Sequence, residues 1–268
     1  MLDAQTYLDA LHRESAALAI AARRDLTAPI PSCPGWTMTT LVVHLTGIYA
    51  HRIAIIRARD TANTSVQSYH DLGLPDEMVP WFDAQFEGQQ EPPGPPHGLV
   101  DLYESKAAEL RAVLDSVGVD QPVWTWWPPE QTAGFWMRRM AQETAVHRWD
   151  AQRAHGDAEP IEPELARDGI DEVLDVIVSS RFDEAEDARE GGGEAYHFHR
   201  TDGPGEWLVR FKGKEATVTH EHAKGDVAVR GTASDLLLFL WGRLPGESLE
   251  VLGDASLIER YFEFVPPV

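Results

Sequence analysis

The residues whose types and spacing most clearly suggest chemistry are Glu143, His147 and Asp150, within the segment FWMRRMAQETAVHRWDAQR at 135–153. Glu143 and His147 are four residues apart, so a helix places them on one face, with Asp150 three residues further along and still near it. Two interpretations compete. The pair is either a surface Glu–His contact, which contributes about 0.2–0.5 kcal/mol, or two ligands of a divalent metal, with Asp150 orienting a ligand.

A third ligand is available in a second predicted helix, 38–59, for which Thr37 is a suitable N-cap. Leu41, His44 and Leu45 belong to one apolar stripe of that helix, so His44 should point toward the protein interior rather than to water. For a lone histidine, the favoured interpretation is a core side chain bonded to a neighbour. Because the Glu143/His147 pair needs a ligand from another helix, His44 is also a candidate metal ligand.

Four predicted helices position these residues. Apolar residues recur with helical spacing in the segments 3–24, 38–59, 98–117 and 135–153;. The connection 60–97 ends in the proline-rich run EPPGPPH, which predicts a long, extended crossing. Four helices with one long connection indicate a four-helix bundle, in which inward side chains on facing helices build metal sites.

A second domain is predicted beyond the segment HGDAEPIEPE at 155–164, which is rich in charge, proline and glycine;. We therefore expect a bundle domain at 1–156 and an α+β domain at 160–268, a fold class of α plus α+β. Short alternating segments between turn residues are typical of an antiparallel meander. The predicted strands are 195–201, 206–212, 216–222 and 226–230. The predicted helices of this domain are 165–182, 234–243 and 255–262.

Four histidines of the second domain form a further candidate metal site. His197 and His199 place two imidazoles on one face of a strand, and His220 and His222 form a similar pair;. Spacing dictates no carboxylate or cysteine partner for them. The favoured interpretation is therefore a set of polar positions on the solvent face of the meander.

Composition restricts the classes of function. The chain has 268 residues, of which 44 are acidic and 23 basic, for a formal net charge of −21. Nucleic acid and anionic membranes would repel such a protein. No run approaches the roughly 18 apolar residues of a membrane span, and the acidic N-terminus is unlike a signal peptide. We expect a cytoplasmic protein, a monomer, that binds neither nucleic acid nor membranes.

Three motifs follow one another along the chain: SCPGWT with a helix containing LVVHL, then RRMAQETAVHRWD, then DVAVRGTASDLLLFLWGR. With these motifs the chain resembles the mycothiol-dependent maleylpyruvate isomerase family of actinobacteria over nearly its whole length. The resemblance implies a DinB-like four-helix bundle followed by a smaller α+β domain similar to sterol-carrier proteins. It also implies a metal, usually zinc, whose ligands fall on His44, Glu143 and His147.

The resemblance further implies that an arginine of the second domain takes part in the isomerase activity. Arg230 is the better match, and Arg243 is the alternative. A salt bridge to Asp235 or another acid is the competing interpretation for Arg230. Cys33, the single cysteine of the chain, is expected to pack near its loop, with a nucleophilic role as the alternative.

Two histidines and one carboxylate leave a coordination position open in many zinc enzymes, and metal binding deprotonates a coordinated thiol at neutral pH. We therefore expect a metal-dependent enzyme that uses mycothiol as a thiolate. It would isomerise a cis-enoyl substrate by reversible thiol addition, or transfer the thiol to a small electrophile. A hydrolase with metal-activated water and a non-catalytic carrier with a structural metal are the alternatives. Histidine and carboxylate ligands suit zinc, nickel and iron alike.

Overall fold

The computed structural model describes residues 1–66, 68–88, 92–183 and 190–267 of the chain. The chain divides into two compact units, Leu2–Glu159 and Pro160–Val268. Each unit has its own set of buried apolar side chains, so the two are taken separately.

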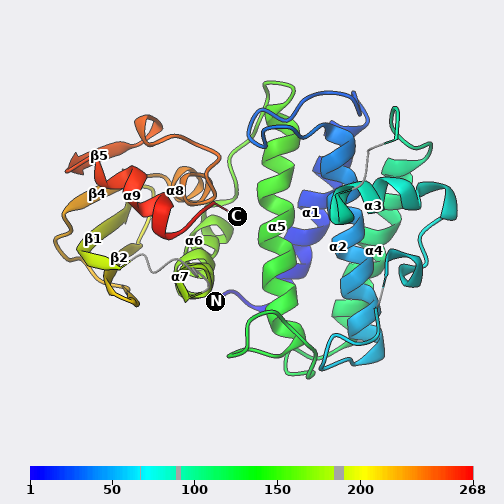
Figure 1. The fold of residues 1–268 in the computed structure, drawn as a ribbon, viewed down its shortest axis with the longest axis horizontal. Helices are drawn as coiled ribbons and strands as arrows, with labels where there is room; N and C mark the ends of the chain where they lie inside the picture. The colour runs from blue at the N-terminus through cyan, green and yellow to red at the C-terminus, as the bar shows by residue number, and fades with distance from the viewer. Residues whose placement is uncertain (67, 89–91, 184–189, 268) are drawn as a thin grey trace. The chain divides into compact units, whose positions relative to one another are not determined.

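The N-terminal unit is a helical bundle (Figure 1). Its long helices, among the described residues, are α1 (Ala4–Ala22), α2 (Met38–Ala58), α4 (Leu99–Ser116) and α5 (Ala133–Arg153). α1 packs against α5 and α4, and α2 packs against α4 and α5. Thr37 caps α2 as expected, because its hydroxyl accepts a hydrogen bond from the backbone N–H of Thr40. The predicted four-helix bundle is confirmed.

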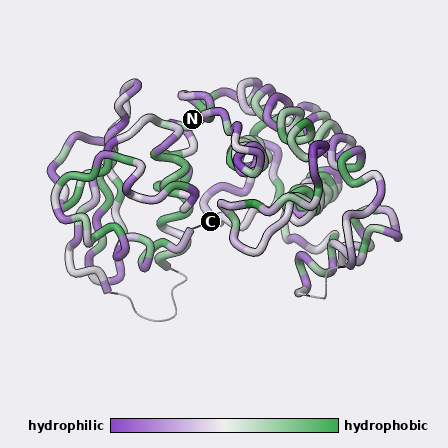
Figure 2. The backbone as a smooth tube through the Cα atoms, turned by 90° about the horizontal axis from the view of Figure 1, so that it is seen from above, coloured by the Kyte–Doolittle hydropathy of each residue, from purple (hydrophilic) through white to green (hydrophobic). Residues whose placement is uncertain are grey.

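The helices differ in how much polar character they bury. Polar and apolar residues alternate along the helices (Figure 2), as expected for elements with one face toward a core;. α5 departs from this pattern, because every residue from Phe135 to Ala151 is buried, charged ones included. Buried charged groups need partners or metal ions, so α5 must meet complementary groups on its neighbours.

Two features of this unit differ from the sequence-based expectation. The connection 60–97 is not extended throughout, because it contains the short helical turns η1 (Tyr69–Leu72) and η2 (Asp76–Met78) and the helix α3 (Val79–Glu87). Fully buried Phe82 anchors α3 against the bundle. The proline content of the connection, which led to the expectation of an extended segment, carries no information about this contact. α2 is long and apolar enough to span a membrane by length and hydropathy alone, yet 67% of its apolar stretch is buried, as in a core helix.

The C-terminal unit contains one sheet whose five described strands have the order β3-β2-β1-β4-β5. The strands are β1 (Gly191–Arg200), β2 (Glu206–Gly213), β3 (Glu215–Thr219), β4 (Val227–Gly231) and β5 (Glu250–Gly253). β1 is antiparallel to β2 but parallel to β4. The antiparallel meander was therefore wrong in one respect: alternation identifies half-buried strands, but it does not tell which edge each strand joins.

Helices pack against one face of this sheet. They are α6 (Pro163–Glu172), which continues through a π-helical turn (Val173–Val178) into α7 (Ser179–Asp183), then α8 (Ala233–Leu240) and α9 (Leu257–Phe264). Phe198 of β1 contacts Phe239 of α8 and Tyr261 of α9. Phe211 of β2 stacks on Phe264, with ring centroids 4.5 Å apart. These aromatic side chains make the core of the unit and fix which face of each strand points away from it.

Candidate metal centre

Two facing helices bring the three predicted ligands to one point. His44 Nε2 of α2 lies 3.2 Å from Glu143 Oε1 of α5, and His147 Nε2 lies 3.2 Å from the same oxygen. The two imidazole rings are nearly perpendicular, with centroids 5.3 Å apart. Glu143 and His147 are buried and His44 is half-buried. The three side chains form a group with the donor atoms and spacing to hold a metal ion, and their role as ligands stays a prediction.

Asp150 lies behind His147, on the side away from Glu143. Its Oδ2 is 2.9 Å from His147 Nδ1, and the side chain is fully buried. Ser32 donates its hydroxyl to Asp150 Oδ1 at 2.5 Å, and the Cys33 thiol donates to Oδ2 at 3.6 Å. A carboxylate at this distance favours a proton on His147 Nδ1, which leaves Nε2 as the ring nitrogen that faces Glu143.

The charge states of Glu143 and His147 show whether this group of side chains suits a cation. Burial alone would raise the pKa of Glu143, but the charge of Arg139 and hydrogen bonds to His147 and His44 hold it well below its usual value. Glu143 is therefore ionised. Burial would lower the pKa of His147, and its bonds to Asp150 and Glu143 more than compensate, so that its pKa is raised.

The pKa of His147 is raised because the carboxylates of Asp150 and Glu143 lie on either side of its ring. The point where His44 Nε2 and His147 Nε2 meet Glu143 Oε1 therefore favours positive charge. A divalent cation held there would supply that charge. Ligands at about 2.0–2.2 Å from a tetrahedral zinc lie roughly 3.3–3.5 Å apart, close to the two 3.2 Å separations in this group. The residues thus fit a metal ion.

Aromatic side chains surround the histidines. The ring of Trp36, in the loop before α2, lies 4.9 Å from that of His44 and 6.0 Å from that of His147. Phe86 of α3 stacks on His44 at 5.9 Å. An apolar cover of this kind keeps water away and strengthens the electrostatic interactions inside it.

Several of these neighbours were not predicted as parts of the site. Arg139 could have been found, because it precedes Glu143 by the same four residues that separate Glu143 from His147. Trp36 and Phe86 carry no spacing signal that links them to the histidines. Cys33 does pack beside its loop, as expected, but the loop reaches Asp150, more than 100 residues away in sequence.

The two predicted arginines lie in the C-terminal unit, on different elements. Arg230 of β4 donates from Nη1 to Glu250 Oε2 of β5 at 2.7 Å, so the competing salt bridge is present, with Glu250 in place of Asp235. Arg243, just after α8, donates to the Trp241 carbonyl at 2.8 Å, with its guanidinium 5.4 Å from the centre of the Trp241 ring. A catalytic role for either arginine stays a prediction.

Known proteins resemble this chain in both units. Residues 8–152 match the family model described as the mycothiol maleylpyruvate isomerase N-terminal domain, and residues 164–260 match the MDMPI C-terminal domain. Crystal structures of the mycothiol-dependent maleylpyruvate isomerase and of a histidine-to-alanine mutant superpose with TM-scores of 0.56 and 0.57 at 12% identity, covering 93% of each chain. At that identity the likeness shows the fold alone. No curated protein matches the sequence.

Proposed function

This chain belongs to the mycothiol maleylpyruvate isomerase family, and on that premise we propose that it is a metal-dependent enzyme that uses mycothiol. Its reaction would be the isomerisation of a small electrophilic substrate or the transfer of the thiol to it. One observation carries the proposal: both Nε2 atoms of His44 and His147 meet one oxygen of an ionised carboxylate, Glu143, at a buried point.

His44, Glu143 and His147 would hold the divalent metal, with zinc as the expected ion. A metal there would lower the pKa of a coordinated thiol, so that mycothiol is present as the reactive thiolate at neutral pH. The chain's own residues prepare the site. Asp150 keeps the proton of His147 on Nδ1. Arg139 keeps Glu143 ionised through their ion pair within α5.

An arginine would supply the positive charge that a carboxylate-bearing substrate needs. We expect Arg230 in this role, with Arg243 as the alternative. Arg230 is about one-third exposed, at 36%, and its partner Glu250 could be replaced by a substrate carboxylate. Maleylpyruvate, named for the structural relatives, is the first substrate to test.

The thiol step can be tested by calorimetry on the zinc-loaded protein. Mycothiol is titrated in two buffers that differ in ionisation enthalpy, and the difference in heat counts the protons released. We expect about one proton per site, and none with S-methyl mycothiol, which has no thiol proton to lose. Cys33→Ser should behave like the wild type, because the proposal requires the external thiol and not the protein's only cysteine.

Three results would contradict the proposal. Binding of mycothiol without proton release would mean that the thiol is not bound as thiolate. Turnover of an ester or amide without added thiol would favour the metal-dependent hydrolase. An absence of mycothiol binding at millimolar concentration would favour the non-catalytic ligand carrier.

A further inference from the structure

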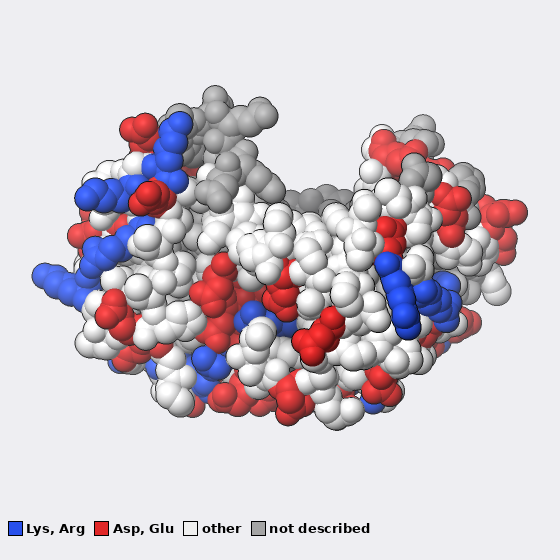
Figure 3. Space-filling model, turned by 90° about the horizontal axis from the view of Figure 1, so that it is seen from below, with Lys and Arg blue, Asp and Glu red and all other residues white. Residues whose placement is uncertain are grey.

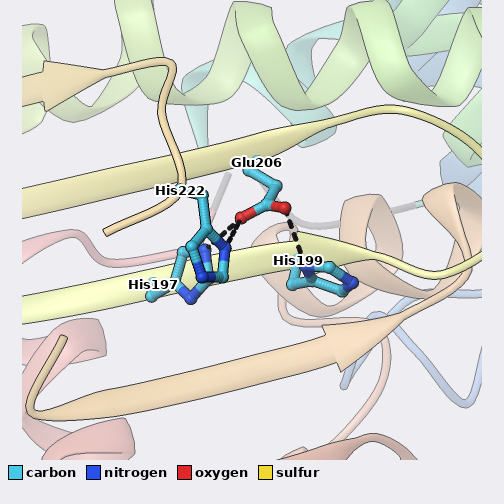
Figure 4. Close-up of side chains that lie close together, drawn as sticks. All are labelled: His197, His199, Glu206 and His222. Carbon is cyan, nitrogen blue, oxygen red and sulfur yellow. Dashed lines mark hydrogen bonds and ion pairs between the residues drawn. The ribbon is translucent and has the colours of Figure 1, made fainter. Parts of the chain in front are cut away.

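A second group of ligand side chains gathers on the sheet of the C-terminal unit, apart from the residues assigned so far. His197 and His199 of β1, Glu206 at the start of β2 and His222 after β3 point toward one another (Figure 4). Each offers one nitrogen or oxygen atom, and these atoms all lie within 4.8 Å of one another. We call these four residues the sheet cluster.

Strand register explains why they meet. His197 and His199 are two residues apart in β1, so both point away from the aromatic core face that carries Phe198. Glu206 is the direct cross-strand partner of His199, which places its carboxylate on the same face. Sequence spacing could not reveal this carboxylate, because it comes from the neighbouring strand.

The cluster differs from the four-histidine site that the sequence suggests. His220 does not belong to it, because His220 Nε2 lies 3.1 Å from Asp175 Oδ1 instead. Glu206 takes the place of that histidine. His197, His199 and His222 do lie as polar residues on the face away from the aromatic core, and Glu206 supplies the carboxylate that their spacing did not indicate.

The donor atoms suit a tetrahedral ion. His197 Nε2 lies 3.0 Å from Glu206 Oε2, and His199 Nδ1 lies 3.3 Å from Glu206 Oε1. His222 Nδ1 also contacts Glu206 Oε2. In a zinc site with ligand distances of about 2.0–2.2 Å, neighbouring ligand atoms are roughly 3.3–3.5 Å apart. The four ligand atoms all lie within 4.8 Å of one another, so a bound ion would draw the more distant ones closer together.

We infer that the sheet cluster binds one zinc ion as a four-coordinate structural site. Four protein ligands close the coordination sphere, which distinguishes structural sites from catalytic ones. On the other side of β1, the cross-strand partner of His199 is Arg230 of β4. The charge of Arg230 is balanced by its ion pair with Glu250. His197 is buried, whereas the His222 side chain is 77% exposed, and this leaves the ion a route from solvent.

The consequence of zinc binding would be local. His222 lies in the connection between β3 and β4, residues 220–226, which a bound ion would fasten to β1 and β2. This connection carries the chain from one edge of the sheet to the pairing of β4 with β1. The ion would therefore stabilise the 220–226 connection, which leads from β3 to the parallel pairing of β4 with β1.

The test is a comparison of zinc content in the full-length protein after equilibrium dialysis against Zn²⁺. His222→Gln and Glu206→Gln should each bind one zinc fewer per chain than the wild type, with affinity at this site lowered more than about 100-fold, the upper range for changes around metal ligands. His220→Gln is the matched control and should retain the wild-type content. His44→Ala should keep the zinc of the sheet cluster, so the result does not depend on the bundle centre.

Hydrogen exchange provides a second readout. Adding Zn²⁺ should slow exchange of the backbone amides of 220–226 in the wild type and in His44→Ala, but not in His222→Gln. Equal zinc content in the wild type and His222→Gln would overturn the inference. Equal loss of zinc in His220→Gln would also overturn it, because the site would then not be the one defined by Glu206.

Discussion

Two buried acids of α5 have different tasks because they have different neighbours. Glu143 faces two imidazole nitrogens and the guanidinium of Arg139. Asp150 faces an imidazole nitrogen of His147 and accepts from a hydroxyl and a thiol. Glu143 therefore lies with two imidazoles that could bind a cation together with it, and Asp150 fixes the orientation of one of them, His147.

The first prediction concerns the proposed ligands. His44→Ala, Glu143→Ala and His147→Ala should each lose one metal equivalent, because two remaining ligands hold a divalent ion poorly. Far-ultraviolet circular dichroism should stay helical. Metal content is measured by mass spectrometry after dialysis, with His51→Ala on the same helix as the control. Wild-type metal content in all three variants would refute the assignment.

The second prediction concerns Asp150. Asp150→Asn keeps the size of the side chain but removes the charge that retains the proton on His147 Nδ1. Metal affinity should fall by roughly 10–100-fold, as is typical for partners of ligands. Competition with a chelator measures it, and the exposed Asp25→Asn is the control. If Asp150→Asn empties the site as completely as His147→Ala, Asp150 is itself a ligand.

At the level of elements, charged pairs join α1 to its neighbours in two settings. Glu14 of α1 accepts from Arg148 Nε of α5 at 2.7 Å, and both side chains are about 5% exposed. Asp9 of α1 pairs with Arg111 of α4 at 3.2 Å, where Asp9 is 58% exposed. Loss of Glu14 removes a carboxylate from a buried guanidinium, whereas loss of Asp9 removes one from a guanidinium that water can reach.

The third prediction follows from this difference. Glu14→Ala should lower the free energy of unfolding by up to about 3–5 kcal/mol, because the buried guanidinium of Arg148 loses its Glu14 carboxylate and keeps hydrogen bonds to Gln152 and to the Glu159 carbonyl. Asp9→Ala, the matched control, should cost less than about 1 kcal/mol. Urea denaturation followed by circular dichroism measures both. Similar costs for the two variants would show that burial of the pair does not govern its contribution.

The fourth prediction concerns the β4–β5 pair, where Arg230 is held by Glu250. If Arg230 binds the substrate carboxylate, Arg230→Ala removes a charged hydrogen bond of about 1.5–3 kcal/mol, which lowers kcat/KM by roughly 10–150-fold. Metal content should not change. Steady-state kinetics with maleylpyruvate measures the effect, with exposed Arg210→Ala as the control. A kinetic loss in Arg243→Ala alone would transfer the role to Arg243.

Over the molecule as a whole, the net charge of −21 opposes the approach of an anionic substrate;. Acidic side chains are spread over the face drawn in Figure 3, with basic ones between them. Salt screens such fields, because the Debye length falls from about 30 Å at 0.01 M to about 8 Å at 0.15 M ionic strength.

The fifth prediction is therefore a salt dependence. The kcat/KM for an anionic substrate should rise severalfold between about 0.01 M and 0.15 M sodium chloride. A neutral electrophile should show no such rise. A fall with salt for the anionic substrate would mean that local positive charge, rather than the net charge, controls its approach.

The sequence by itself indicated the long helices and the candidate ligands of the bundle. Helical periodicity located its four long helices, because each must bury one apolar stripe whatever its partner. Local spacing placed Glu143 and His147 on one face of a helix, and the family resemblance favoured them as metal ligands over a surface pair. His44 needed one further argument, namely that it shares an apolar stripe with Leu41 and Leu45.

Tertiary structure decided every relation between elements that no spacing encodes. It placed Asp150 against the loop of Ser32 and Cys33, paired β4 in parallel with β1, and brought Glu206 to three histidines. The physical reason is the same in each case. Periodicity fixes which side of an element is buried, but the neighbour that covers it is chosen by packing and register across the whole unit.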